Sequence, residues 1–253
     1  MTTQHENGAR FRALHEGDPF VIPNPWDAGS ARVLAELGFQ ALATTSSGFA
    51  FTLGRSDGEA TLDDVARHVA QLAAATDLPV SVDLENGYDD PGEAIRRVAE
   101  AGAVGGSIED WDGERLYDVG GAVDRLEAAV EAARSLEFPF VLTARAENHI
   151  RGNPDLDDTI ARLQAYEAAG ADVLYAPGLN NVGEIRALCA AVSKPVNVLA
   201  RPNLTLTEIV EAGAQRISVG GALTWVAVDA FAQAARAVRY DGDFSELDKG
   251  GPF

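Results

Sequence analysis

Cysteine is nearly absent from this sequence, since Cys189 is the only one in 253 residues. An intramolecular disulfide is therefore impossible, and a structural zinc site built on cysteines is excluded. Basic residues are also scarce, because 20 Lys and Arg stand against 39 Asp and Glu, for a formal net charge of −19. A field of this sign repels nucleic acid and anionic membrane surfaces, so both are excluded as partners.

Long apolar segments are missing as well. No apolar run is long enough to cross a membrane, and the first residues, MTTQHENGARFRALHEGDPF, contain no apolar core of a signal peptide. These absences predict a soluble, cytoplasmic protein, and the negative charge is attributed to solubility.

The sequence does contain a regular alternation of short apolar runs with segments of helical period. Eight apolar runs lie at residues 20–22, 41–45, 80–84, 106–108, 140–144, 172–176, 196–200 and 216–219. The helical segments between and after them lie at residues 30–37, 62–75, 92–101, 123–136, 156–169, 182–192, 206–212 and 222–238. Strands that alternate with helices are typical of βα units in a parallel sheet.

Proline and glycine divide the chain at matching points. A proline precedes every second apolar run and a glycine ends the helical segment after it, at Pro19, Pro79, Pro139 and Pro195 and at Gly38, Gly102, Gly170 and Gly213. Proline suits the first residue of a strand because it lacks an N–H, and glycine takes the left-handed conformation that ends a helix. The pattern indicates a four-fold β-α-β-α repeat and predicts a (β/α)8 TIM-type barrel.

We expect a single domain over residues 1–253, with 1–17 and 240–253 as terminal tails. An open doubly wound sheet is the alternative, but no G-x-G-x-x-G follows the first strand, which disfavours its dinucleotide-binding form. Four helix starts carry local signals: capping boxes at Thr61 and Thr205, and proline at the first helical position in Asp90-Pro91 and Asn153-Pro154.

Acidic residues gather where two neighbouring predicted strands end, which is where barrel enzymes carry their active site. Asp83 and Glu85 end the third run, and Glu109 ends the fourth. Asp83 and Glu85 are two residues apart, so both point to one side if the strand stays extended. Converging carboxylates repel one another unless a cation lies among them, and oxygen ligands suit Mg²⁺ or Mn²⁺. The alternative is that these acids cap the N-termini of helices.

Other polar residues at the strand ends are candidate substrate contacts. Arg145 is either a bidentate clamp for a substrate carboxylate or the ion-pair partner of Glu147 or Glu109. The stretch Ser46-Ser47-Gly48 either presents hydroxyl and N–H groups to an anion or forms a polar turn. The remaining candidates are Asn197 and Arg201 at the end of the seventh run, and His149, which is either a base or a surface histidine.

Several motifs occur together in a fixed order: PNPWDAGSARVLAELGFQALATTSSG, LGRSDG, VDLENGYDDP, SIED and TARAEN. Over residues 20–150 this set resembles the isocitrate lyase / phosphoenolpyruvate (PEP) mutase superfamily. The resemblance implies a (β/α)8 barrel whose last helix is exchanged with a neighbouring subunit, in a homodimer or homotetramer. It also implies Mg²⁺ bound near an α-keto or α-hydroxy carboxylate.

The resemblance assigns roles to single residues. Asp83 and Glu85 of D-L-E-N-G-Y stand where the superfamily has its D-x-D-T-G-Y acids, and Glu109 matches its L/I-E-D glutamate. Asp57 matches the aspartate after the second strand, which adds it to the expected metal ligands. Arg145 matches the arginine that contacts the substrate carboxylate, and Ser46-Ser47-Gly48 resembles the carboxylate-binding Ser-Gly turn.

One departure from the superfamily limits the chemistry. The lyases carry a K-(K/R)-C-G-H loop after the fourth strand, and the mutases a loop with Lys and Asn-Ser. Residues 110–121 here read DWDGERLYDVGG, with no cysteine, lysine, histidine or asparagine. Candidates to replace the missing acid–base group are Tyr117, Asp118 and His149.

Three functions follow as hypotheses. The first is a Mg²⁺-dependent carbon–carbon lyase, of decarboxylase or retro-aldol type, acting on a small 2-oxo or 2-hydroxy di- or tricarboxylate through an enolate that the metal and Arg145 stabilise. The second is P–C chemistry on phosphonopyruvate, as mutase or hydrolase, with a phosphate pocket from Arg115, Arg151 and Arg201. The third is a barrel that binds a metabolite without chemistry.

Overall fold

The computed structural model describes residues 2–248, and it confirms the predicted (β/α)8 barrel. Eight parallel strands form one sheet in the order β1-β8-β7-β6-β5-β4-β3-β2. Between β1 and β2 the Ala43 N–H donates to the Pro23 carbonyl at 3.1 Å, so the ring is nearly closed. The strands are β1 (Phe20–Ile22), β2 (Leu42–Ala43), β3 (Val80–Asp83), β4 (Gly105–Glu109), β5 (Val141–Arg145), β6 (Val173–Tyr175), β7 (Val196–Leu199) and β8 (Arg216–Ser218).

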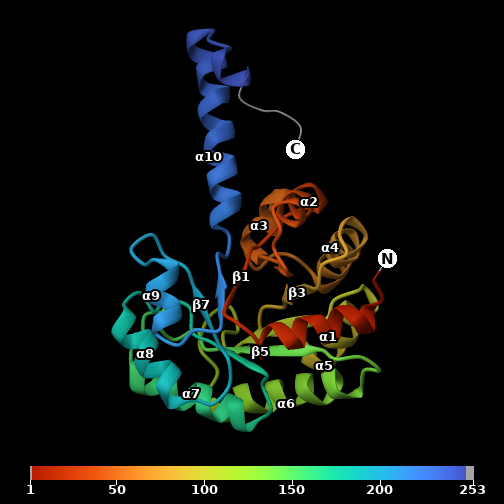
Figure 1. Cartoon of the computed structure of the whole chain (residues 1–253), viewed down its shortest axis with the longest axis vertical. Helices are drawn as coiled ribbons and strands as arrows, with labels where there is room; N and C mark the ends of the chain where they lie inside the picture. The colour runs from red at the N-terminus through yellow and green to blue at the C-terminus, as the bar shows by residue number, and fades with distance from the viewer. Residues whose placement is uncertain (1, 249–253) are drawn as a thin grey trace.

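Helices surround the barrel and alternate with its strands (Figure 1). They are α1 (Gln4–Leu14), α2 (Ala28–Glu36), α3 (Ser46–Thr52), α4 (Leu62–Ala75), α5 (Pro91–Glu100), α6 (Val119–Ser135), α7 (Leu156–Ala168), α8 (Val182–Ala191), α9 (Leu206–Glu211) and α10 (Ala222–Arg236). A π-helical turn (Ala237–Asp241) and a 3₁₀ turn (Ser245–Asp248) follow α10. None of the helices described over residues 2–248 has the length and apolarity needed to span a bilayer.

The local signals at the helix ends are confirmed with one exception. Gly38, Gly102, Gly170 and Gly213 have φ angles of 87°, 109°, 105° and 107°. Thr61 and Thr205 form capping boxes, and Asp90 caps α5 with Pro91 in its first turn. The start predicted at Asn153-Pro154 is wrong, because the Asp155 side chain accepts from the N–H groups of Asp157 and Asp158 and α7 begins at Leu156.

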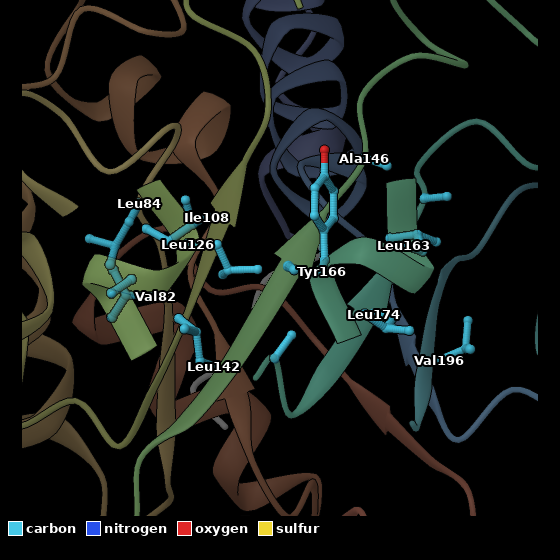
Figure 2. Packing of buried hydrophobic residues seen from close by; sticks show 14 of the residues in the cluster. Val82, Leu84, Ile108, Leu126, Leu142, Ala146, Leu163, Tyr166, Leu174 and Val196 are labelled. Atoms are coloured by element: carbon cyan, nitrogen blue, oxygen red, sulfur yellow. The ribbon is translucent and has the colours of Figure 1, made fainter. Parts of the chain in front are cut away.

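The main core lies between the barrel wall and the helices. Figure 2 shows strand residues such as Leu142 and Leu174 packed with Leu126 of α6 and Leu163 of α7. These four leucines are at most 3% exposed, and each such burial stabilises the fold by about 1.5–3 kcal/mol. The strands read as nearly continuous apolar runs because their outward side chains pack against helices.

The barrel interior holds an apolar cluster and buried polar side chains at overlapping levels, since Phe20 pairs with Arg216 and Ile22 with Ser218. A separate cluster fills the base, with Phe11, Phe20, Ile22, Ala41, Val104, Val141 and Val173. Five buried polar side chains belong to the strands of the same barrel: Ser81, Thr143, Asn197, Arg216 and Ser218. A polar interior needs internal hydrogen-bond partners or a ligand, since unpaired polar groups are costly to bury.

Part of the segment expected to be an N-terminal tail forms α1, which closes the base of the barrel. Phe11 of α1 is fully buried in the basal cluster. A Cβ at Gly8 would lie 2.3 Å from the Pro139 carbonyl oxygen, so only glycine allows this close approach. The Gln215 side-chain amide before β8 donates to the carbonyls of Leu14 and Gly17, which holds the end of α1. In the other expected tail, residues 249–253 lie outside the described residues.

Burial of His15 beneath the barrel makes stability dependent on pH. Desolvation, with a smaller contribution from Arg216, lowers the pKa of His15 to about 3. The unfolded chain takes up a proton on this side chain near pH 6.5 and the folded chain does not, so stability decreases as the pH falls from 6.5 toward 3. We expect the loss from His15 alone to reach about 2 kcal/mol at pH 5.

This expectation is tested by urea unfolding of the wild type and His15→Gln between pH 7 and pH 5. The decrease in unfolding free energy over this range should be about 2 kcal/mol smaller in the variant. His5→Gln, at an exposed position of the same helix, is the matched control and should keep the wild-type dependence. Equal pH dependence in wild type and His15→Gln would contradict the assignment.

Helix α10 stands away from the rest of the molecule (Figure 1). Only its beginning packs against the body, where Thr224 is buried and the Trp225 ring meets Phe51 of α3 at 5.5 Å. Farther along, Val226 is 68% exposed and Phe231 is 74% exposed. The expected exchange of this helix with a neighbouring subunit stays a prediction, because the structure contains one chain.

Candidate active site

A cavity of about 190 Å³ opens at the C-terminal ends of the strands. Residues from all eight strands and from the loops after several of them line it. Of the residues predicted as site residues, those that line it are Ser46, Ser47, Asp57, Asp83, Arg145, Asn197 and Arg201. The cavity lies where barrel enzymes carry their active sites.

Three acids meet beside this cavity, and of the three Asp83 is the one that lines it. Carboxylate oxygens of Asp83, Glu85 and Glu109 lie within 4.8 Å of one another. Asp83 ends β3 and Glu109 ends β4, which are paired in register, so the parallel sheet itself brings their side chains together. None of the three caps a helix in residues 2–248, so the capping alternative is wrong for them.

Glu85 reaches the cluster by a different route from the one predicted. The strand ends at Asp83 and does not stay extended, because Glu85 has a φ of 51°. This left-handed residue turns the chain, and the Glu85 N–H donates to the Asp83 carboxylate at 3.3 Å. The extended-strand argument was therefore wrong, although both acids do share one site.

The acids repel one another in a poorly solvated place. Burial, followed by the charges of Asp83 and Asp57, raises the pKa of Glu85 to about 8. Burial also raises the pKa of Glu109 well above its usual range, against the opposing effect of Arg145. Glu109 Oε2 is buried without a hydrogen-bond partner among residues 2–248. Three hard oxygen donors with an unused buried lone pair fit a cation such as Mg²⁺ or Mn²⁺.

Asp57 takes a more peripheral position. It lines the cavity from the loop before α4 and its side chain is exposed, but it is not one of the three clustered acids. Its charge acts on Glu85 across the site. Its expected role as a metal ligand stays a prediction.

Arg145 is the cation of this acidic side. Its guanidinium lies 3.3 Å from Glu109 and 3.7 Å from Asp83, and it also pairs with the buried carboxylate of Glu147. Its face covers the Tyr175 ring at 5.4 Å. The ion-pair interpretation of Arg145 is therefore confirmed, and the same side chain also lines the cavity, where it can meet a ligand.

Ser46 and Ser47 begin a helix that was not predicted. Thr45 caps α3, and the stretch Ser46-Ser47-Gly48 forms its first turn, not an open polar turn. Ser46 and Ser47 line the cavity, whereas Gly48 does not. A Cβ at Gly48 would lie 2.5 Å from Thr224 Oγ1, so glycine is needed there for the contact with α10.

His149 and Tyr117 do not line the cavity. The Tyr117 hydroxyl accepts from the Asn86 amide at 3.2 Å, and the Arg125 guanidinium covers its ring. His149 Nε2 is buried without a hydrogen-bond partner among residues 2–248. The structure thus brings the predicted acids and Arg145 together. Tyr117 bonds to Asn86, the residue after Glu85, and its absence from the cavity lining is shared by Glu85 and Glu109.

Two neighbours of this cluster lie at the ends of β2 and β6 and a third at the start of β8, and none of them was among the predicted site residues. Thr44 accepts from the Asp83 N–H at 2.9 Å, and Tyr175 packs beneath Arg145. Arg216 lines the cavity floor from the start of β8. The spacing of Arg216 and Ser218, on either side of apolar Ile217, was a signal that both face the barrel interior.

The sequence profile of the family described as phosphoenolpyruvate phosphomutase matches residues 11–239. The chain belongs to this family. It is therefore an enzyme of the isocitrate lyase / PEP mutase superfamily, whose members are typically dependent on a divalent metal. The alternative of a non-catalytic barrel is not supported.

Relatives within the superfamily cover nearly the whole chain. A Burkholderia cenocepacia J2315 protein described as a lyase/mutase is 52% identical, with a TM-score of 0.95 over 98% of this chain and 93% of that one. The oxaloacetate decarboxylase of Rhodopseudomonas palustris BisB5 is 31% identical over 94% of this chain and 86% of that protein. The structure of oxaloacetate acetylhydrolase with 3,3-difluorooxalacetate is 26% identical, with a TM-score of 0.88 over 97% of this chain and 91% of that one.

Proposed function

We propose that this enzyme is a divalent-metal-dependent carbon–carbon lyase for a small 2-oxo or 2-hydroxy di- or tricarboxylate. The observation that carries the proposal is the cluster of Asp83, Glu85 and Glu109 beside Arg145 at the end of the barrel. Cleavage next to a ketone leaves the bonding electron pair on the substrate as an enolate, which cations placed in advance stabilise. Mg²⁺ or Mn²⁺, when bound, would polarise the 2-oxo group.

The residues of the chain would divide the remaining work. Asp83, Glu85 and Glu109 would hold the ion, with Asp57 at the edge of the site. Arg145 would face the carboxylate next to the 2-oxo group, while Ser46, Ser47, Asn197 and Arg201 would contact the substrate from the cavity wall. Gly48 would act through the shape of the first turn of α3, since it does not line the cavity.

Decarboxylation of oxaloacetate is the version that we favour. Its C3–C4 bond breaks, CO₂ leaves, and the electron pair stays as the enolate of pyruvate, which then takes up a proton. The first step needs no base, whereas a retro-aldol cleavage needs one. The similarity to an oxaloacetate decarboxylase supports the same choice.

Turnover of oxaloacetate is the direct test. With Mg²⁺ we expect stoichiometric pyruvate and CO₂, and EDTA should abolish the activity until Mg²⁺ is restored in excess. The non-enzymatic decarboxylation of oxaloacetate by Mg²⁺ is subtracted with heat-denatured enzyme. Release of oxalate and acetate instead of pyruvate would replace decarboxylation by hydrolytic C–C cleavage. No turnover of any 2-oxo or 2-hydroxy di- or tricarboxylate would overturn the proposal.

Phosphonopyruvate serves as the contrasting substrate. Of the three arginines considered for a phosphate pocket, Arg201 alone lines the cavity. The Arg115 side chain is 86% exposed and pairs with Asp112, and Arg151 is engaged with Glu147 and the Trp111 ring. Phosphate release or isomerisation of phosphonopyruvate faster than oxaloacetate turnover would reverse our preference.

A second copy of this chain is part of the proposal. The exposed apolar side chains of α10 need cover that the described single chain does not supply, and a homodimer or homotetramer would bury them. Phe231→Asp is expected to shift the protein toward the monomer in light-scattering chromatography. Gln233→Asp, on the same helix, is the control that should keep the wild-type mass. An unchanged mass for Phe231→Asp would contradict burial of this face.

A further inference from the structure

Arg216 is an ionised side chain in the middle of the barrel, and the proposed mechanism leaves it unused. It stands at the start of β8, is 5% exposed, and lines the floor of the active-site cavity. Burial lowers its pKa to about 10, so the guanidinium still carries its charge at pH 7.

All hydrogen-bond partners of this guanidinium are neutral. Nε donates to Asn197 Oδ1 at 2.8 Å, and Nη2 donates to Thr143 Oγ1 at 3.0 Å. Nη1 lies 3.3 Å from His15 Nε2. An arginine has no acceptor atom, so His15 Nε2 must accept, and His15 Nδ1–H donates to the Phe11 carbonyl at 2.8 Å. Helix α1 therefore holds the guanidinium from below without balancing its charge.

No carboxylate in residues 2–248 pairs with Arg216, in contrast to the other buried arginine of the cavity. Arg145 is surrounded by Asp83, Glu109 and Glu147, so its charge is already balanced by the chain. A buried cation without a counter-ion is costly. An anion in the cavity would supply the missing charge.

The Arg216 guanidinium has more N–H donors than hydrogen bonds to the chain. It carries five N–H groups, and the three bonds above use one on each nitrogen. Each terminal nitrogen thus keeps one N–H without a partner among residues 2–248. A pair of N–H groups at the end of the fork is the arrangement that binds a carboxylate in bidentate fashion.

The depth of Arg216 suits the second carboxylate of a short diacid. Thr143, which binds Nη2, lies two residues before Arg145 on β5, and both face the barrel interior. Two residues of a strand span about 6.6 Å. The carboxyl carbons of a four-carbon diacid are three C–C bonds, or about 4 Å, apart. Both arginines line the same cavity, and a four-carbon diacid with a hydrogen bond at each end is of the same length scale as this strand spacing.

We propose that Arg216 binds the distal carboxylate of a four-carbon dicarboxylate from the floor of the cavity, while Arg145 and the acidic side take the carboxylate next to the oxygen function. This assignment rests on the proposed function only in placing the substrate in this cavity. It makes Arg216 a residue that selects dicarboxylates over monocarboxylates.

The proposal predicts a separation of KM from kcat. In a decarboxylation the distal carboxylate leaves as CO₂, so its contact with Arg216 is present in the bound substrate and weakens as the bond breaks. Arg216→Gln should therefore raise KM for oxaloacetate without lowering kcat.

Binding of malate and lactate in the presence of Mg²⁺ tests the assignment by calorimetry, without turnover. The two 2-hydroxy acids differ by the distal carboxylate. We expect the wild type to bind malate about 10- to 100-fold more tightly than lactate, from the usual strength of charged hydrogen bonds. Arg216→Gln should bring the two affinities within about twofold, and Arg216→Lys should restore part of the difference.

Controls separate binding from folding. Arg12→Gln removes an arginine outside this cavity, on α1, and should keep the wild-type preference. If Arg216→Gln does not fold, as judged by circular dichroism, the proposal is judged from two other measurements. These are the ratio of malate to lactate affinity in the wild type and the same ratio in Arg216→Lys. Equal affinities for malate and lactate in the wild type, or an unchanged preference in folded Arg216→Gln, would overturn the proposal. A retained preference without turnover of any 2-oxo or 2-hydroxy di- or tricarboxylate would overturn the proposed function alone.

Discussion

Asp83→Asn is expected to lower kcat/KM for oxaloacetate by about 10³-fold, because it removes one charge from the group that would hold the divalent ion. The substitution keeps the size of the side chain and an oxygen that can accept the Glu85 N–H. The measurement is initial rate at increasing Mg²⁺, together with the rise in Tm that Mg²⁺ produces. Both the activity and the Mg²⁺-dependent rise should be largely lost.

Asp89→Asn is the matched control, since Asp89 lies in the same loop with an exposed side chain. It should retain the wild-type rate and the Mg²⁺ response. If Asp83→Asn stays fully active at the same Mg²⁺ concentration, the acidic cluster does not hold the metal, and the proposed function loses its main support.

Arg145→Met is expected to lower the free energy of unfolding by about 3–5 kcal/mol, because it removes the guanidinium that pairs with Asp83, Glu109 and Glu147 and leaves only the more exposed Arg151 near the two glutamates. Glu147 is fully buried and Glu109 is 5% exposed, so water cannot replace the guanidinium. Urea unfolding measures the loss. The double variant Arg145→Met/Glu147→Gln should recover part of it, since one of the unpaired charges is then absent.

An exposed ion pair provides the contrast. Arg97 pairs with Asp63 at 3.0 Å, with side chains that are 47% and 72% exposed. Arg97→Met should therefore cost no more than about 1 kcal/mol. If Arg145→Met costs as little as Arg97→Met, the buried pairs do not stabilise the barrel mouth.

The two buried arginines of the cavity divide the electrostatic work. Arg145 stabilises the acids that gather at the ends of β3, β4 and β5, and only what remains of its field is available to a substrate. Arg216 meets neutral partners, so its field acts on whatever anion enters the cavity. Under the two proposals, binding of the first carboxylate would depend on the metal, whereas binding of the second would depend on Arg216.

Much of the fold was predictable because it is encoded locally. Proline before a strand and glycine after a helix act through φ and the missing N–H, which depend on no distant residue. The positive φ angles of Gly38, Gly102, Gly170 and Gly213 agree with that reasoning. Helices α1 and α3 were missed, since α1 has little amphipathic pattern and α3 is a short insertion between β2 and α4.

The site was predictable to the extent that it follows from strand ends. Asp83, Glu109 and Arg145 end adjacent strands, and a parallel barrel brings such ends to one edge. Glu85 depended on a left-handed turn that no strand argument contains. Arg216 looked like an ordinary strand residue in the sequence. It is notable only because its hydrogen-bond partners in residues 2–248 are neutral and none is a carboxylate.

By itself the amino-acid sequence determined the alternation of the eight strands with the helices that follow most of them, the barrel and the edge at which acids and Arg145 collect, since these follow from periodicity, backbone preferences and parallel connections. Only the tertiary structure decided which charges are balanced. Ion pairing depends on distances of a few ångströms between residues far apart in the chain, as for His15 and Arg216, and on how far water is excluded from them.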